Sequence, residues 1–134
     1  MDSIITPAYA SRSRPVLSFG AAVAGMEEQT ELACLIAAEP ERAEIYREVV
    51  RIAADVYCRG AERPVVIDGE DVTFGYLQEL YGMLTSEHVR YVVDNLERYP
   101  AEIKYKKAFL RTALANAVLE MHTAAQNEYT VHRL

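Results

Sequence analysis

Apolar residues recur at helical spacing through most of the chain, and the pattern is clearest between residues 40 and 58. The apolar positions there follow one another at intervals of four, three and four residues: Ile45, Val49, Ile52 and Val56. At about 100° per residue they share one face, and the opposite face is charged: Glu44, Arg47, Glu48, Arg51 and Asp55. The pattern predicts a helix that buries one face and keeps the other in water.

Further segments with the same period predict an all-α fold, a single compact bundle of about five helices. Besides the first, the expected helices cover "EEQTELACLIAAE", about Val72 to Met83, a segment ending near Arg98, and a long segment ending near Met121. Thr85 or Ser86 can cap the helix that ends near Arg98. The core is expected to join the four apolar positions above to a second set: Val89, Val92, Leu96, Phe109, Leu110 and Leu114.

The segment "RPVVIDGED" holds a short β-branched run between Pro64 and the turn pair Asp68-Gly69. A strand needs a partner strand, and the helical pattern elsewhere offers none. The segment is therefore expected to be a short extended connector, not part of a sheet.

Three parts follow from these patterns. Residues 1–25 are rich in small residues without an amphipathic period and predict a flexible N-terminal arm. Residues 26–122 form the helical domain, and residues 123–134 form a C-terminal tail that frays.

Composition limits the compartment and the partners. The chain has 134 residues, is 51% hydrophobic and carries a net charge of −6, which suits one core and disfavours binding of nucleic acid by the whole surface. No apolar run approaches the roughly 18 residues of a membrane span, and Asp2, Pro7 and Pro15 interrupt any signal-peptide pattern. We expect a soluble cytoplasmic protein that makes no membrane contact.

Cys34 and Cys58 lack a metal-ligand spacing, and both stand among apolar residues of expected helices. They are expected to be free thiols and small core residues in a reducing compartment, with a disulfide as the alternative.

Short motifs give no enzyme chemistry. The chain has no phosphate loop, no dinucleotide fingerprint and no zinc-protease motif, and His88, His122 and His132 stand far apart. The sequence "DGED" lacks the alternating ligands of a calcium loop. We expect no catalytic residue, metal, cofactor or small-molecule substrate, and therefore no enzyme.

The stretch "EIKYKKAFLRTALANAVLEM" is the candidate site. Residues 98–111 hold five positive residues and one acid, a local net charge of +4, and four of the cations are candidates for binding a partner or nucleic acid: Lys104, Lys106, Lys107 and Arg111. On a helical wheel Lys104, Lys107 and Arg111 fall within about 60° on the face away from the core. Lys106 falls on the core side, so it either extends its amine to water or precedes the helix.

Three tyrosines lie near these cations in the sequence: Tyr91, Tyr99 and Tyr105. Tyrosine beside lysine is typical of platforms that bind single strands, and few phosphate contacts would give weak binding with a logarithmic salt slope of roughly −2 to −3. The alternative is a solvated helix face with tyrosines at the edge of the core.

Two segments carry a resemblance: "VIDGEDVTFGYLQELYGMLTSEHVRYVVDNLER" and "IKYKKAFLRTALANAV". With "VVRIAADVYC" upstream, they resemble a C-terminal helical domain of unknown function in Firmicute replication initiators of the RepA type, from plasmids and conjugative elements. The similarity spans roughly residues 45–118. The chain departs from that family by lacking the winged-helix part, and by having Ile103-Lys104-Tyr105 where the family tends to have I-R-N.

The resemblance implies a helical interaction domain of a mobile genetic element that contacts a host replication protein or another nucleoprotein, with weak nucleic-acid contact as a second mode. The missing winged helix leaves two hypotheses open: an excised domain, or a standalone phage or mobile-element inhibitor of a host nucleoprotein such as a CRISPR effector.

Overall fold

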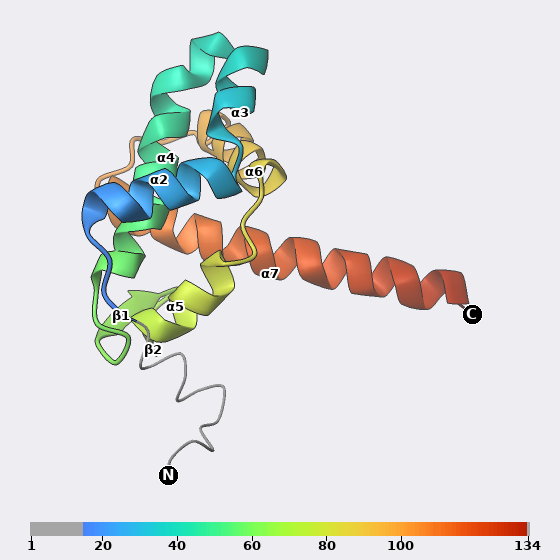
Figure 1. Ribbon diagram of the computed structural model, residues 1–134. Helices are drawn as coiled ribbons and strands as arrows, with labels where there is room; N and C mark the ends of the chain where they lie inside the picture. The colour runs from blue at the N-terminus through green and yellow to red at the C-terminus, as the bar shows by residue number, and fades with distance from the viewer. Residues whose placement is uncertain (1–14, 134) are drawn as a thin grey trace.

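The computed structural model describes residues 15–133, with side chains as far as Met121 (Figure 1). The described part is mostly helical, as the sequence predicts. Its α-helices are α2 (Phe19–Gln29), α3 (Leu32–Ala38), α4 (Ala43–Asp55), α5 (Phe74–Tyr81), α6 (Ser86–Glu97) and α7 (Lys106–Arg133). Two single 3-10 turns, at Pro40–Arg42 and Val56–Cys58, flank α4. Strands β1 (Pro64–Ile67) and β2 (Glu70–Thr73) complete the fold.

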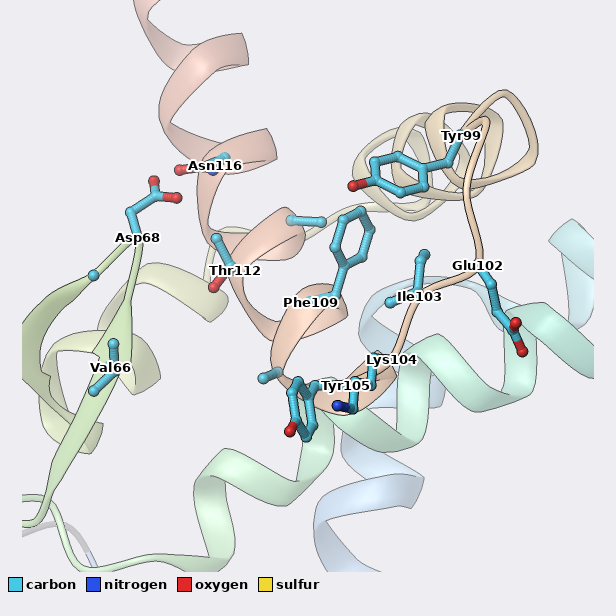
Figure 2. Close-up of a pocket in the computed structure, with 13 residues that line it drawn as sticks. Val66, Asp68, Tyr99, Glu102, Ile103, Lys104, Tyr105, Phe109, Thr112 and Asn116 are labelled. Atoms are coloured by element: carbon cyan, nitrogen blue, oxygen red, sulfur yellow. The ribbon is translucent and has the colours of Figure 1, made fainter.

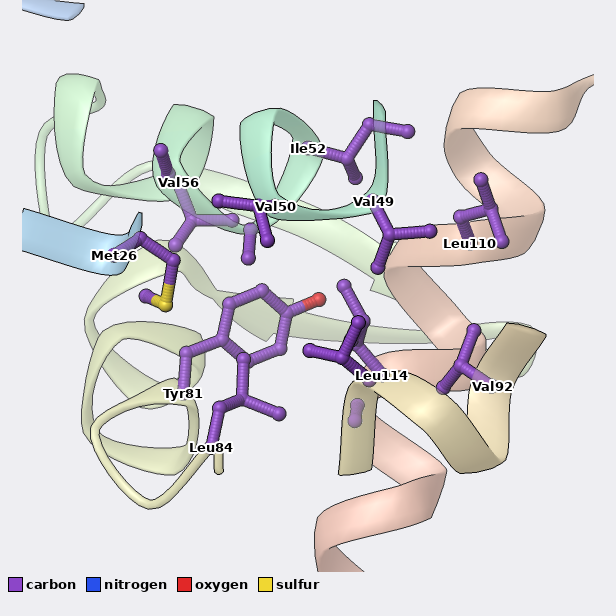
Figure 3. Packing of buried hydrophobic residues seen from close by; sticks show 14 of the residues in the cluster. Met26, Val49, Val50, Ile52, Val56, Tyr81, Leu84, Val92, Leu110 and Leu114 are labelled. Carbon is purple, nitrogen blue, oxygen red and sulfur yellow. The ribbon is translucent and has the colours of Figure 1, made fainter. Parts of the chain in front are cut away.

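Helix α4 is the central element of the core. It packs against α2, α3, α6 and α7, so its buried surface is wider than the single stripe that the sequence predicts. Together with the first residue of the 3-10 turn after it, α4 buries three of the four predicted positions and adds others: Tyr46, Val49, Val50, Ile52, Ala53, Ala54 and Val56. Figure 3 shows these valines facing Met26 of α2, Tyr81 of α5, Leu84 in the loop after α5, and Leu110 and Leu114 of α7.

Three predicted core residues lie at the edge of the core. Ile45, Leu96 and Phe109 are only partly buried, whereas Val89, Val92, Leu110 and Leu114 are buried as expected. The reason for Phe109 is that α7 turns this side chain toward Tyr99 and away from α4. The two rings meet edge to face with centroids 5.1 Å apart.

The expected extended connector is a β-hairpin, so the expectation that no partner strand exists is wrong. β1 pairs antiparallel with β2, with Val65 opposite Val72 and Ile67 opposite Glu70. The turn between them is Asp68-Gly69, with φ of 53° and 77°. Positive φ at both central residues defines the tight type I′ turn, whose twist matches that of the strands.

Both ends of the helical region extend beyond the predicted bounds. Helix α2 begins at Phe19, inside the expected arm, because Ser18 caps it by accepting a hydrogen bond from the Ala21 amide at 3.2 Å. The Leu17 amide also donates to the Tyr57 carbonyl at 3.0 Å, which attaches this segment to the domain. The rest of the expected arm, residues 1–14, lies outside the described residues.

At the other end, α7 continues to Arg133 where a fraying tail was expected after residue 122. Figure 1 shows its C-terminal half running out beyond the other elements. Among the described residues, no helix has the length and apolar content that a membrane span requires.

Both cysteines are free thiols, as predicted. Cys34 is nevertheless exposed on α3, so its interpretation as a core residue is wrong, while Cys58 is partly buried. Burial raises the pKa of the Cys58 thiol above its usual value, which keeps the group protonated and unreactive at neutral pH.

Candidate interaction surface

The first turn of α7 distributes the four candidate cations over different surroundings. Lys106 is the first residue of the helix and is exposed, and its Nζ lies 3.1 Å from Oε1 of Glu48 on α4. Of the two alternatives from the sequence, the position of Lys106 fits an amine extended to the exposed surface, and it does not fit a residue that precedes the helix. The ion pair neutralises part of the expected basic surface.

Lys107 is paired as well. Its Nζ lies 3.2 Å from Oδ2 of Asp55, and Nη2 of Arg59 lies 3.1 Å from the same oxygen. The Asp55 side chain is only 16% exposed, so two cations compensate one largely buried carboxylate. This arrangement joins the start of α7 to the end of α4.

Arg111 does not point freely to water, contrary to the helical-wheel prediction. It is partly buried, and its guanidinium carbon lies 5.8 Å from the centre of the Phe74 ring. Its Nε is buried without a hydrogen-bond partner in the described part of the chain. The aromatic ring stabilises the cation here, and Arg111 contributes to packing between α5 and α7.

Lys104 precedes α7 and is exposed. Its Nζ lies 5.5 Å from the centre of the Tyr105 ring, and it makes no ion pair with any residue that the structure describes. The four cations therefore do not form one continuous patch. Lys104 alone among them lines a hollow on the side of α7 that faces the hairpin.

This hollow has a volume of about 690 Å³, within the range of typical ligand sites. We call it the Tyr105 hollow. It is lined by the hairpin, by the loop after α6 and by the first turns of α7: Val66, Asp68, Gly69, Tyr99, Glu102, Ile103, Lys104, Tyr105, Ala108, Phe109, Thr112, Ala113 and Asn116. Figure 2 shows Asp68 and Asn116 at one end and Tyr99 and Phe109 on the opposite wall.

Large apolar side chains around the Tyr105 hollow are unusually exposed. Tyr105 is 70% exposed, Val66 56% and Tyr99 47%. Tyr99 and Tyr105 come from the loop between α6 and α7, and Val66 comes from β1, yet all three line one hollow. Tyr91, the third tyrosine noted in the sequence, does not belong to it, because its hydroxyl donates to Oε1 of Glu120 at 3.1 Å. An apolar, aromatic surface of this kind is typical of a contact with another molecule.

The charge of the lining separates classes of ligand. Asp68 and Glu102 bring two negative charges and Lys104 one positive charge, which gives a net charge of −1. Neither carboxylate forms an ion pair within the described part of the chain. A phosphate backbone would be repelled by this lining, whereas a polypeptide with an apolar anchor and a basic side chain would be favoured.

The strongest ionic cluster lies elsewhere and is already saturated. Nη1 of Arg42 lies 2.8 Å from Asp94 and Nη2 lies 2.6 Å from Glu97, which joins the start of α4 to α6. A hydrogen bond to Tyr46 and the pairing with Glu97 raise the pKa of Arg42, and a hydrogen bond from Tyr46 lowers the pKa of Glu39. These contacts stabilise the fold and leave no vacant position for a ligand. Among the described residues, no three His, Cys, Asp or Glu side chains converge as metal ligands.

Sequence reasoning identified Lys104, Tyr99 and Tyr105 but missed the hairpin side of the hollow. Val66 and Asp68 reach it because β1 packs against α7. The available signal was the Asp-Gly pair between two runs of strand length, which indicates a hairpin even where the second run is polar.

The sequence comparison places the chain in a family. It belongs to the family described as "Family of unknown function (DUF6017)", which matches residues 24–132. Comparison with curated proteins and with solved structures gave no match. The match runs from the second turn of α2 to the last turn of α7 and includes all of the Tyr105 hollow.

Proposed function

We propose that this chain is a non-enzymatic interaction domain of a mobile genetic element, and that it binds a protein partner at the Tyr105 hollow. The observation that carries this proposal is the 70% exposure of Tyr105 at the rim of a hollow that Tyr99 and Phe109 also line. The few residues that dominate the binding energy of an interface are enriched in tyrosine, tryptophan and arginine.

The class of partner comes from the sequence resemblance to domains of plasmid replication initiators. That resemblance supports a host replication protein, or another nucleoprotein, as the partner. The net charge of −1 in the lining supports polypeptide over nucleic acid as the occupant of the hollow. Lys104 at the rim leaves room for a weak nucleic-acid contact beside it.

The test uses a photo-crosslinking residue at position 105 of the full chain, expressed in cells that carry the element. Tyr76 is the matched control position, because it is also a tyrosine, is 44% exposed and lies on α5 outside the hollow. A crosslink to one protein from position 105 and not from position 76 is the expected result. The captured protein is then purified, and its affinity for wild type, Tyr105→Ala and Tyr76→Ala is measured.

We expect Tyr105→Ala to weaken binding by roughly tenfold to a hundredfold, and Tyr76→Ala to leave it unchanged. A replisome or primase component as the captured protein supports the replication role. Capture of a host defence nuclease would replace that role with the inhibitor hypothesis. Equal affinity of both variants would contradict the proposed surface itself.

A further inference from the structure

The free edge of β1 forms one wall of the Tyr105 hollow. The hairpin contributes Val66, Asp68 and Gly69 to the lining, and no residue of β2 takes part. β1 also contacts α7, so the hollow lies on the side of β1 away from β2 (Figures 1 and 2). A two-stranded hairpin has an unpaired edge on each side, and this one faces a space of about 690 Å³.

The register shows which backbone groups that edge presents. In a two-residue hairpin the pair that closes the turn, Ile67 and Glu70, exchanges both hydrogen bonds, and bonded pairs alternate along the ladder. Val65 and Val72 therefore form the next bonded pair, while Val66, opposite Asp71, directs its N–H and C=O away from β2. No residue in the described part of the chain hydrogen-bonds to these two groups of Val66.

Pro64 supports this geometry. Pro64 lies two residues before Val66, so its backbone groups also point to the outer edge. Its missing N–H falls there, where proline does not disturb the hairpin. The outer edge thus offers the donor and acceptor of Val66 together with the carbonyl of Pro64. A proline at the end of the strand also limits how far a second copy of the same edge could pair with it.

We propose that an extended segment of the partner protein adds to β1 as a third strand inside the Tyr105 hollow. This inference rests on the proposed function and specifies the form of its ligand. Backbone hydrogen bonds to Val66 would supply affinity, and alternate side chains of the segment would enter the hollow.

The lining specifies the chemistry of the segment. One inward side chain is apolar and packs against Tyr99 and Phe109, the partly apolar wall of the hollow. A neighbouring inward side chain, two positions away, is basic and lies beside Asp68, whose carboxylate makes no ion pair with the described residues. The segment therefore has a basic and an apolar residue two positions apart. Which of the two comes first depends on whether the segment runs parallel or antiparallel to β1; we call this the basic–any–apolar pattern in either order.

The experiment selects random short peptides from a displayed library on the purified full chain, and measures the selected peptides against three proteins. Val66→Pro removes the outward N–H and leaves the bonds to β2 intact, whereas Val66→Thr keeps the N–H and a β-branched side chain. Tyr105→Ala tests the hollow without altering the edge. Hydrogen exchange of the Val66 amide in wild type, with and without peptide, reports the same bond without any substitution.

We expect peptides with the basic–any–apolar pattern to be enriched and to bind Val66→Thr like wild type. They should bind Val66→Pro about tenfold more weakly, the equivalent of about one hydrogen bond. Slower exchange of the Val66 amide on binding supports the proposal even if Val66→Pro fails to fold. Strand addition is overturned if the selection enriches no peptide. It is also overturned if peptide binding leaves the hydrogen exchange of the wild-type Val66 amide unchanged and Val66→Pro binds the peptides as tightly as wild type. If Tyr105→Ala alone then loses binding, the proposed surface stands and only its ligand form is wrong; if neither variant loses binding, both fail.

Discussion

Nζ of Lys107 lies 3.2 Å from Oδ2 of Asp55, and this pair connects the first turn of α7 to the last turn of α4. Lys107 was one of the cations expected to meet a partner. Its position shows that a lysine on an exposed helix face can form an ion pair with a largely buried carboxylate of the same chain, here that of Asp55. The pair also predicts how the lysines at the start of α7 differ in their effect on stability.

Lys107→Ala should destabilise the fold by on the order of 1 kcal/mol, because Asp55 is 16% exposed and loses one of its two compensating cations. Lys106→Ala is the matched control. Its partner Glu48 is 41% exposed, so we expect a change near zero. Chemical unfolding of both variants provides the measurement, and equal midpoints would show that Asp55 does not depend on Lys107.

His88 makes the stability of α6 dependent on pH. The Thr85 amide donates to Nδ1 of His88 at 2.9 Å, which closes a capping box and requires an unprotonated nitrogen. Burial lowers the pKa of His88 below its ordinary value of 6.5, so the folded state favours the neutral ring. This contribution is complete above pH 6.5 and is lost as the pH falls from 6.5 through the folded pKa.

His88→Gln should remove this part of the pH dependence, because glutamine accepts the same hydrogen bond without titrating. Thermal unfolding between about pH 7 and pH 5 should show a smaller decline for the variant than for wild type. Parallel declines would mean that another group is responsible.

The edge position of Phe109 changes the expected cost of its truncation. A central phenylalanine would cost about 3–5 kcal/mol on replacement by alanine, but Phe109 is only partly buried. Leu110 is fully buried beside it, so Leu110→Ala should lower the free energy of unfolding by about 2–5 kcal/mol, which is more than Phe109→Ala does. Unfolding midpoints of Phe109→Ala and Leu110→Ala decide the order, and a larger loss for Phe109 would place it in the core after all.

The hairpin turn depends on Gly69, whose φ is 77°. Gly69→Ala should destabilise the protein by about 1 kcal/mol, because a Cβ disfavours this backbone region. Gly69→Asn should cost less, since asparagine tolerates positive φ. The space around Gly69 is open, so the comparison isolates the backbone effect from any steric clash.

Nucleic-acid binding should be weaker than the charge pattern alone suggests. With Lys106 and Lys107 paired to carboxylates and Arg111 partly buried, Lys104 is the candidate cation that remains exposed without an ion pair in the described part of the chain. A short single strand should bind with a logarithmic salt slope of about −1, not the −2 to −3 expected from several free cations. Fluorescence anisotropy at several salt concentrations measures this slope, and a value near −3 would restore the wider basic patch.

The sequence alone determined the helical class and the centre of the core. The spacing of Val49, Ile52 and Val56 requires one buried helix face whatever surrounds it, because a helix repeats every 3.6 residues. Thr85 likewise acts as the predicted cap of α6, since it forms a capping box with His88 within its own turn. Such local rules need no knowledge of distant segments.

Only the tertiary structure decided the partners of the charged and aromatic residues. A helical wheel of α7 places Lys107 and Arg111 on an outer face, because it shows one helix without its neighbours. In the fold, Asp55 of α4 pairs with Lys107 and the Phe74 ring lies against Arg111. The hairpin was signalled by Asp68-Gly69, yet its position beside Tyr105 depends on how β1 packs against α7. Periodicity describes one element at a time, whereas a surface is formed where elements distant in sequence meet, and that meeting is fixed by packing of the whole core.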